Sequence, residues 1–351
     1  MQRRMLIRLA ATSGAAVAAG LAAAPAARAR TRARLTVAAD GSGDVTTIQA
    51  AVDAVPSGNA ARFTIEIKPG VYAGQVIVPA DKPNILLRGR GRHAGQVVIT
   101  DDRANGTPRP DGGTWGTSGS ASVTVDGADF AAANLTFANS FDEAAHPEIT
   151  SRQAVALLSR ADRLTFDNVR FLGNQDTLYL NSPAADVTSR IYLRHCYVEG
   201  DVDFIFGRGT AVLDRCRIHS LTRGSATNNG YVTAPSTSVT NPYGLLFSRC
   251  AFTSDAPPAS VYLGRPWHPS QDPAAIGQTV IRDSVLAAHL GPTPWSDFGT
   301  WSWRDARFAE YHNSGPGALV TPDRPQLTDA EAVGYHPAAY LAGTDNWSPQ
   351  C

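Results

Sequence analysis

A four-residue motif, polar–apolar–x–apolar, recurs along the middle of this chain and limits its possible folds more than any other feature. The first apolar positions of successive copies are separated by 34, 27, 20, 34 and 34 residues. Repeats of about 20 or more residues with variable insertions are typical of solenoids, in which each repeat forms one coil. The copies, of which the last is weaker, are Asn134–Phe137, Asn168–Phe171, His195–Val198, Arg215–Ile218, Arg249–Phe252 and Asp283–Leu286.

The segments around these motifs have the pattern of short β-strands broken by Gly, Pro, Asn and Asp. Coils made of strands predict an all-β solenoid, the parallel β-helix. A β-sandwich is the alternative, although it does not predict one motif at these intervals. Short helices are expected near the two ends, over Asp44–Val55 and from the capping-box pattern Thr328–Glu331 toward Leu341.

The first 29 residues have the pattern of an export signal peptide. Arg3, Arg4 and Arg8 form a positive segment, Leu9–Ala24 is apolar, and Ala27–Ala29 is an A-x-A cleavage pattern. The Arg pair followed by an apolar run fits the twin-arginine route, with ordinary Sec export as the alternative. We therefore expect a secreted, extracellular protein with signal peptide 1–29.

The remainder, residues 30–351, is expected to form a single β-helix domain. Hydrophobic residues make up 43% and charged residues 18% of the chain, which permits a sizeable core. The chain has 31 basic and 31 acidic residues, without the basic excess typical of nucleic-acid binding. No later stretch reaches the ~18 apolar residues of a membrane span. These observations predict neither nucleic-acid nor membrane partners. We also expect a monomer, because helices at the two ends of the β-helix would cap the exposed sheet edges.

Coils in register place the first apolar residue of each motif above the next, at a strand spacing of ~4.8 Å. Cys196 and Cys216 occupy this position on neighbouring coils. A disulfide usually joins Cα atoms ~4.4–6.8 Å apart, and export permits oxidation. We therefore predict a disulfide between Cys196 and Cys216, with Cys250 as a buried thiol.

The same register brings two aspartates together. Asp176 lies seven residues after Val169, and Asp203 lies seven residues after Cys196. Neighbouring carboxylates cannot both ionise cheaply, so one pKa should rise, and a pair divided in this way supplies one acid and one base or nucleophile. The alternative is that each aspartate caps a backbone amide in a turn.

Further polar and aromatic residues accompany the aspartates, namely Gln153, Gln175, Arg265 and Trp267. Together these pieces resemble the pectin methylesterase family, whose fold is a right-handed parallel β-helix. The family motif that corresponds to Gly70–Tyr72 usually ends in Glu two residues further on, where this chain has Gly74. The segments that carry the resemblance, in family order, are Gly70–Tyr72, Gln153–Leu157, Gln175–Leu178, Asp203–Gly207 and Leu263–Trp267.

The resemblance implies a carboxylic ester hydrolase that removes C6 methyl esters from methylated homogalacturonan (pectin) and releases methanol, without cofactor or metal. It implies that Asp203 is the nucleophile and Asp176 the general acid and base. Gln153 and Gln175 would form the oxyanion hole, and Arg265 would orient Asp203. It also implies contacts with the sugar chain from Thr117, Phe204, Tyr179, Ala234 and Trp267.

Other interpretations stay open at this point. A pectate-lyase-like enzyme could hold Ca²⁺ with Asp201 and Asp203, although Ca²⁺ usually takes 6–8 oxygen ligands. A non-catalytic carbohydrate-binding β-helix or a structural surface protein would not need a poised aspartate pair. A last group of aromatics either walls the cleft or packs within loops: Trp295, Trp301 and Trp303.

Overall fold

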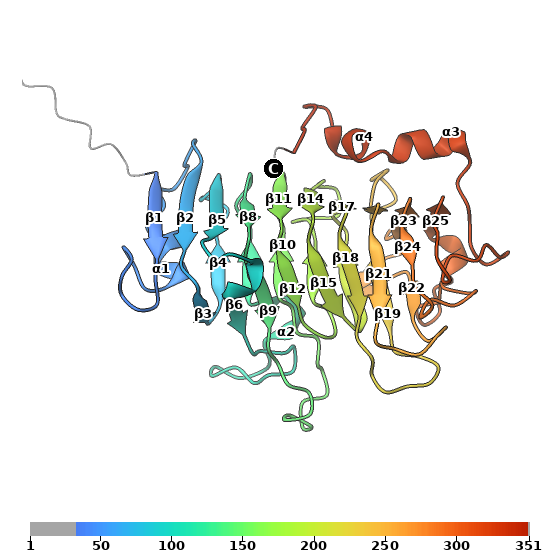
Figure 1. Cartoon of the computed structure of the whole chain (residues 1–351), viewed down its shortest axis with the longest axis horizontal. Helices are drawn as coiled ribbons and strands as arrows, with labels where there is room; N and C mark the ends of the chain where they lie inside the picture. The colour runs from blue at the N-terminus through green and yellow to red at the C-terminus, as the bar shows by residue number, and fades with distance from the viewer. Residues whose placement is uncertain (1–32, 350–351) are drawn as a thin grey trace, which may run out of the picture. The chain divides into compact units, whose positions relative to one another are not determined.

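The computed structural model describes residues 33–349, which form a parallel β-helix of three sheets (Figure 1). From β2 to β24, successive strands visit sheet A, sheet B and sheet C in a fixed order and then begin the next coil in sheet A. Neighbouring strands within each sheet run parallel and in register. The predicted fold class is confirmed, whereas the predicted signal peptide lies outside the described residues.

Sheet A contains β1 (Arg34–Val37), β2 (Phe63–Ile67), β5 (Ile85–Gly89), β8 (Ala131–Ala133), β11 (Leu164–Asp167), β14 (Arg190–Arg194), β17 (Thr210–Asp214), β20 (Leu245–Ser248), β23 (Gln278–Arg282) and β25 (Arg307–Tyr311). Sheet B contains β3 (Gly70–Ala73), β6 (Val97–Asp101), β9 (Thr136–Asn139), β12 (Arg170–Leu172), β15 (Tyr197–Gly200), β18 (Arg217–Ser220), β21 (Ala251–Ser254) and β24 (Val285–Leu286). Sheet C contains β4 (Val76–Val78), β7 (Val123–Val125), β10 (Leu157–Ser159), β13 (Leu178–Leu180), β16 (Val202–Gly207), β19 (Tyr231–Pro235) and β22 (Tyr262–Gly264). The helices are α1 (Ile48–Asp53), α2 (Gly116–Gly119), α3 (Asp329–Ala332) and α4 (Pro337–Ala342), with short 3-10 turns η1 (Ala94–Gln96), η2 (Pro269–Gln271), η3 (Trp303–Asp305) and η4 (Val333–Tyr335).

The repeated motif forms the corner between sheets A and B. Its polar residue is left-handed in every copy, a conformation that Asn and Asp adopt more readily than most residues. The next residue turns into the interior, where all members of the stack are at most 2% exposed, as predicted: Leu135, Val169, Cys196, Cys216, Cys250 and Ser284. The left-handed residues are Asn134 (φ 55°), Asn168 (52°), His195 (53°), Arg215 (53°), Arg249 (56°) and Asp283 (51°).

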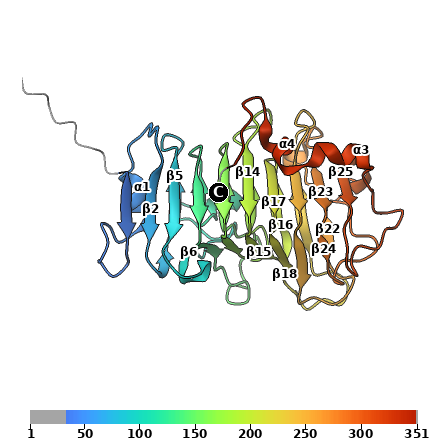
Figure 2. The same ribbon diagram turned by 45° about the horizontal axis from the view of Figure 1, so that its top comes forward.

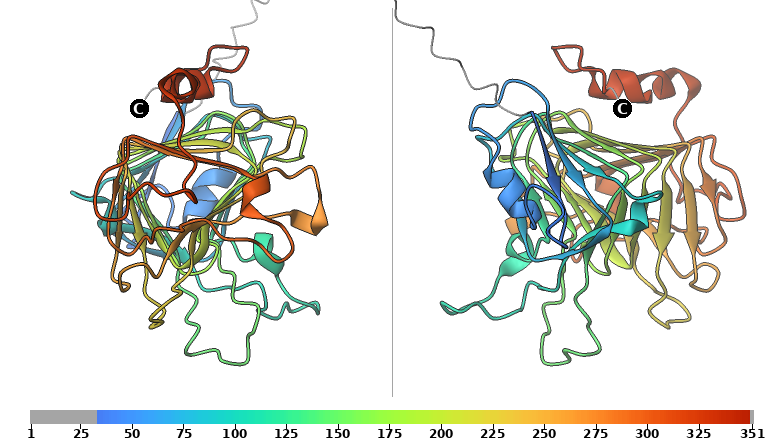
Figure 3. Two further views of the ribbon diagram at one scale, coloured as in Figure 1. Left: turned by 90° about the vertical axis from the view of Figure 1, so that its right-hand side faces the viewer. Right: turned by 60° about the vertical axis from the view of Figure 1, so that its left-hand side comes forward.

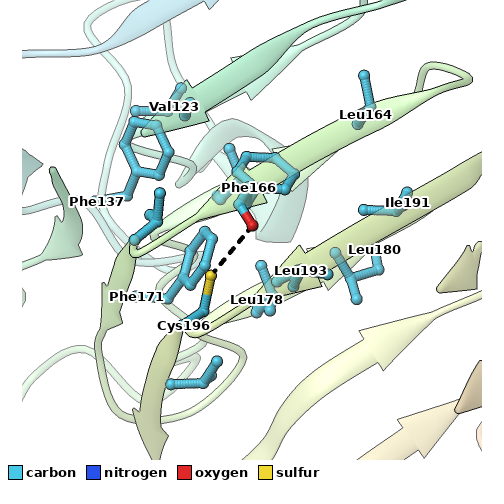
Figure 4. Close-up of a cluster of buried hydrophobic side chains, with 14 of the residues drawn as sticks. Val123, Phe137, Leu164, Phe166, Phe171, Leu178, Leu180, Ile191, Leu193 and Cys196 are labelled. Atoms are coloured by element: carbon cyan, nitrogen blue, oxygen red, sulfur yellow. Dashed lines mark hydrogen bonds between the residues drawn. The ribbon is translucent and has the colours of Figure 1, made fainter. Parts of the chain in front are cut away.

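The coils enclose a space along the axis of the stack (Figure 3). Buried apolar side chains fill this space. Phe137, Phe166 and Phe171 pack together with ring centroids 5.5–6.5 Å apart (Figure 4). Burying each such ring contributes about 1.5–3 kcal/mol. The core therefore runs along the whole stack and holds the outer faces of the sheets in place.

The predicted disulfide is wrong, because Cys196, Cys216 and Cys250 are free, buried thiols. In-register stacking aligns the three side chains in parallel, and each thiol donates a hydrogen bond to a main-chain carbonyl of the preceding coil. The Sγ–O distances are 3.5 Å for Cys196 to Phe166 O (Figure 4), 3.6 Å for Cys216 to Leu193 O and 3.3 Å for Cys250 to Leu213 O. Burial raises the pKa of Cys216 well above its usual value.

The N-terminal helix closes its end of the coil stack, as predicted, but is shorter than the expected Asp44–Val55. It begins after Thr47, whose side chain accepts a hydrogen bond from Ala50 N at 3.2 Å. Ile48 and Val52 join the core beneath β1, β2 and β4.

The C-terminal helices occupy a different place from the predicted one. The capping box of Thr328 and Glu331 is present, but α4 lies on the outer face of sheet A, as Figure 2 shows. Tyr340 of α4 packs over Val212, Leu246 and Val280, which are neighbours in register on three strands. No helix in residues 33–349 is both long and apolar enough to cross a lipid bilayer.

Irregular chain on either side of β25 covers the C-terminal end of the coils instead. Single bridges join it to the last strand of each sheet: Leu290 and Trp295 to sheet C, Ser314 to sheet B and Gln326 to sheet A. The exposed edges that invite pairing with another chain are thereby reduced.

Gly74, the departure from the family pattern, follows β3 with φ +108°. Residues other than glycine rarely adopt this backbone conformation. The turn at position 74 of this chain therefore favours glycine over the Glu that is usual in the family.

We predict that alkylation after denaturation without reductant labels Cys196, Cys216 and Cys250 and that the native protein reacts only slowly, because burial withholds the thiolate. Peptide mapping by mass spectrometry measures both. A linked pair of peptides carrying Cys196 and Cys216 would contradict the structure.

Candidate active site

A cleft of about 590 Å³ lies over the outer face of sheet C. All five predicted catalytic residues line it, and so do four of the five predicted sugar contacts. The residues brought together are Gln153, Gln175, Asp176, Asp203 and Arg265, with Thr117, Tyr179, Ala234 and Trp267.

The two aspartates occupy matching positions on adjacent coils, as the register predicted. β13 and β16 pair Leu178 with Ile205, two residues beyond each aspartate. Asp176 N donates to Val202 O at 3.0 Å, which ties the two turns together. Both aspartates are left-handed, with φ 67° for Asp176 and 52° for Asp203. This shared local turn directs two carboxyl groups into one cleft.

Burial and mutual repulsion set the protonation of the pair. Asp176 is 8% exposed and Asp203 is 6% exposed. Burial, and then the charge of Asp203, raise the pKa of Asp176 well above its usual value. Burial also raises the pKa of Asp203, but hydrogen bonds and charge from Arg265 oppose that rise. These surroundings favour the protonated form more strongly at Asp176 than at Asp203, whose ionised form Arg265 stabilises.

Arg265 is held in a fixed orientation against Asp203. Its Nε and Nη2 donate to the two carboxylate oxygens at 2.9 and 2.7 Å. Its guanidinium lies between the rings of Tyr231, 3.8 Å from the centroid, and Phe298, 4.3 Å from the centroid. A desolvated cation–π contact is worth up to about 2 kcal/mol. The two rings therefore fix the orientation of the guanidinium group. They contact its faces and leave its N–H groups free to bond to the carboxylate of Asp203.

The two glutamines are positioned by the backbone of neighbouring coils. Ala154 N, next to Gln153, donates to Gln175 O at 3.0 Å. Neither side-chain amide hydrogen-bonds to a residue within 33–349, and Gln153 Oε1 is buried without a partner. Both amide N–H groups are therefore available to an oxygen atom bound in the cleft.

Aromatic rings form the floor of the cleft. Tyr179 and Phe206 stack with centroids 4.1 Å apart, and Trp267 meets Phe206 edge-on at 5.6 Å. Thr117 also lines the cleft, and its hydroxyl accepts a hydrogen bond from Asn105 Nδ2 at 3.0 Å. Such a flat apolar floor with polar walls suits the face of a sugar ring.

Phe204 was predicted to contact the sugar chain, but it is fully buried in the core. The left-handed turn at Asp203 breaks the strand alternation, and the register against β19 shifts between Val202 and Ile205. The side chain that reaches the cleft is therefore Phe206, two residues further on.

Sequence reasoning also missed two cleft residues from loops, Trp115 and Phe298. Arg103 lies over the Trp115 ring at 4.3 Å from its centroid and so braces it. Both aromatics are contributed by irregular segments, where no periodic pattern marks a side chain as facing a site. An aromatic between a polar residue and a glycine was the one available signal.

The three tryptophans of the C-terminal region do not line this cleft. Trp295 is buried and stacks on Phe308 with centroids 4.4 Å apart. Trp301 stacks on His268 at 3.7 Å, and Trp303 packs against Arg304. Loop packing is therefore the correct interpretation of all three.

Asp201 is engaged elsewhere. Its Oδ2 accepts from Arg223 at 2.6 Å and its Oδ1 from Val202 N at 2.6 Å. It lines a separate hollow beside sheet B, together with Glu143. No group of three or more potential metal ligands gathers among residues 33–349. The calcium interpretation, which needs Asp201 beside Asp203, finds no support in this arrangement.

Comparisons with known proteins agree with the geometry. The family model described as Pectinesterase matches residues 34–341. Pectinesterase A of Dickeya chrysanthemi is 37% identical over 339 residues, covering 86% of this chain and 87% of that protein. A pectin methylesterase solved in complex with a hexasaccharide superposes with a TM-score of 0.81 at 34% identity, covering 90% of this chain and 98% of the other. The carrot pectin methylesterase gives 0.75 at 32% identity, covering 89% and 93%.

We predict that Arg265→Gln raises the pKa of Asp203, because the substitution removes the hydrogen bonds and the positive charge that lower it. Carbon NMR of the labelled carboxyl groups measures the titration. The matched control is Arg249→Gln, which breaks a comparable pair with buried Asp214 on sheet A and should leave Asp203 unchanged. An unaltered Asp203 titration in Arg265→Gln would contradict the assignment.

Proposed function

This chain belongs to the pectinesterase family, and we propose that the cleft on sheet C is the site at which it acts. The protein is a carboxylic ester hydrolase that removes methyl esters from pectin. Its product at each hydrolysed unit is a free galacturonate carboxylate, and its leaving group is methanol. The remaining question is which side chain performs each step.

In the first step, the ionised carboxylate of Asp203 attacks the ester carbonyl carbon. The carbonyl oxygen becomes an oxyanion that accepts hydrogen bonds from the amides of Gln153 and Gln175. Collapse of this intermediate breaks the bond to the methoxy oxygen, and Asp176 gives its proton to departing methanol. An acyl-enzyme anhydride on Asp203 remains.

In the second step, water attacks the sugar carbonyl of the acyl-enzyme. Asp176, now a carboxylate, takes a proton from that water. The bond between the carbonyl carbon and Asp203 breaks, which frees the galacturonic acid unit and restores both aspartates. The same amides hold the oxyanion again.

The observation that carries this proposal is that the two aspartates have different surroundings, which favour an ionised Asp203 and a protonated Asp176. A carboxylate is a weak nucleophile, so it must be kept ionised and fixed, and the bidentate contact from Arg265 does both. A leaving methoxide needs an acid, and burial and the charge of Asp203 raise the pKa of Asp176 well above its usual value, which favours the protonated form that can serve as that acid. None of the cleft-lining residues within 33–349 is a histidine.

We also propose that the chain is exported and acts outside the cell as a monomer. The pattern of residues 1–29 supports export, and a polymer such as pectin cannot reach an enzyme behind a membrane. The covered ends of the β-helix support a monomer, since α1 closes one end and bridged irregular chain closes the other.

The test of function is to assay methanol and unsaturated sugar ends from highly methylated pectin, with and without chelator. We expect methanol without unsaturated ends, unaffected by chelator. Asp203→Asn should lower the rate by roughly 10⁴-fold or more, because the nucleophile is lost. Asp214→Asn, which alters another buried, Arg-paired carboxylate, should keep the activity of folded protein. Chelator-sensitive unsaturated ends would instead establish a lyase.

A bell-shaped dependence of kcat/KM on pH is expected. The rate falls at low pH as Asp203 takes up a proton, and falls at high pH as Asp176 loses the proton meant for methanol. Asp176→Asn removes the titrating acid, so the remaining activity, lower by about 10²–10⁴-fold, should lose the alkaline limb. An alkaline limb unchanged in Asp176→Asn would assign the acid to another group.

A further inference from the structure

Asn139, at the end of β9, joins three segments of the chain and is not used by the proposed mechanism. It is buried, at 6% exposure, and it lines the hollow beside sheet B rather than the cleft. Its Nδ2 donates hydrogen bonds to Arg103 O at 2.9 Å, Ser120 O at 3.0 Å and Val155 O at 3.2 Å, and its Oδ1 accepts one from Phe141 N at 3.0 Å. This one amide therefore ties together main chain that lies 16 to 36 residues away in the sequence.

Two of the segments that Asn139 joins carry residues of the cleft. The segment between Arg103 and Ser120 contains Thr117, and the segment that leads to Val155 contains Gln153. Apart from α2, both segments are irregular chain between strands. Side-chain bridges therefore contribute to their placement, in addition to the main-chain bonds between coils.

Ser120 makes a second bridge between the same two segments. Its buried Oγ accepts a hydrogen bond from Val155 N at 3.1 Å and donates one to Thr117 O at 2.7 Å. The main chain adds a bond from Asn105 N to Gln153 O at 2.7 Å. The chain from Gln153 to Val155 is thus bonded to the segment that carries α2.

The side chain of Gln153 is placed by the main chain that carries it. Its amide forms no hydrogen bond to a residue within 33–349, and its Oε1 is buried without a partner. A donor stabilises an oxyanion only if it is already aimed at the place where the charge develops. The aim of the Gln153 amide therefore depends on the position of its main chain, and through it on Asn139.

We propose that Asn139 is a positioning residue, which holds the main chain so that the Gln153 amide reaches the oxyanion. The inference rests on the proposed function, since Asn139 acts through the role of Gln153 in ester hydrolysis. Without the Asn139 amide, Ser120 O and Val155 O lose a common donor, and the two segments can shift relative to each other. A displacement of about 1 Å at a reacting group can cost about 10²-fold in rate.

The test is a double-mutant cycle on methanol release from methylated pectin. Gln153→Ala should lower kcat by roughly 10²–10³-fold, because one oxyanion donor is lost. Asn139→Ala should lower kcat by roughly 10–10²-fold with little change in KM, because the donor is displaced while the contacts with the sugar chain remain. Added to Gln153→Ala, the same substitution should cost less than about twofold, because the donor that it positions is already absent.

The matched control is Asn313→Ala, which removes another amide that joins the main chain of a neighbouring coil. Asn313 follows β25, where its Nδ2 donates to Ile281 O at 3.0 Å and its Oδ1 accepts from Ser284 N at 3.1 Å. It does not line the cleft, so this variant should keep the wild-type kcat. Thermal melting verifies that each variant is folded.

If Asn139→Ala does not fold, Ser120→Ala decides the question, because it removes the second bridge and leaves a side chain of similar size. It should lower kcat by roughly threefold to tenfold, the value of one hydrogen bond, and this loss should also disappear in Gln153→Ala.

Three outcomes would contradict these expectations, and they differ in what they overturn. An equal loss of kcat with and without Gln153, or an effect confined to KM, would overturn this inference alone. Wild-type kcat in folded Gln153→Ala would remove Gln153 from the proposed mechanism, and the inference with it. Failure of wild type to release methanol would overturn the proposed function itself.

Discussion

The in-register hydrogen bonding of one coil to the next is the constraint on which the rest of this structure depends. It converts a one-dimensional spacing along the chain into a three-dimensional stack, because equivalent residues of adjacent coils must lie one strand apart. The bond from Asp176 N to Val202 O is one member of this ladder, and the bond from Ala154 N to Gln175 O is another. Residues far apart in sequence thus meet on one face without any helix or loop having to fold over them.

The chemistry follows from placing two like groups in unlike surroundings. Stacking alone would make Asp176 and Asp203 equivalent, since both have the same left-handed turn and similar burial. Arg265 breaks this symmetry by pairing with Asp203 only, between the rings of Tyr231 and Phe298. Low exposure increases the resulting difference between the pKa values of the two aspartates, because a buried charge is stabilised mainly by its fixed neighbours.

Local interruptions of regular strand geometry decide which side chains reach the cleft. The left-handed turn at Asp203 sends Phe204 into the core and Phe206 into the cleft, whereas the family resemblance implied that Phe204 contacts the sugar chain. The parallel stacking of Cys196 and Cys216 likewise offers each thiol a carbonyl acceptor rather than the other sulfur. In both cases the approximate position was right, and the direction of the side chain was not predictable from spacing.

The sequence by itself determined the coil architecture, the interior stack beginning at Leu135 and the pairing of Asp176 with Asp203, because these depend on residue type and spacing along one strand direction. Only the tertiary structure decided that the C-terminal helices cover sheet A and that Phe298 packs against Arg265. These depend on where irregular segments and corners bring side chains from different coils. Such placement is set by packing across the whole molecule, which no local pattern encodes.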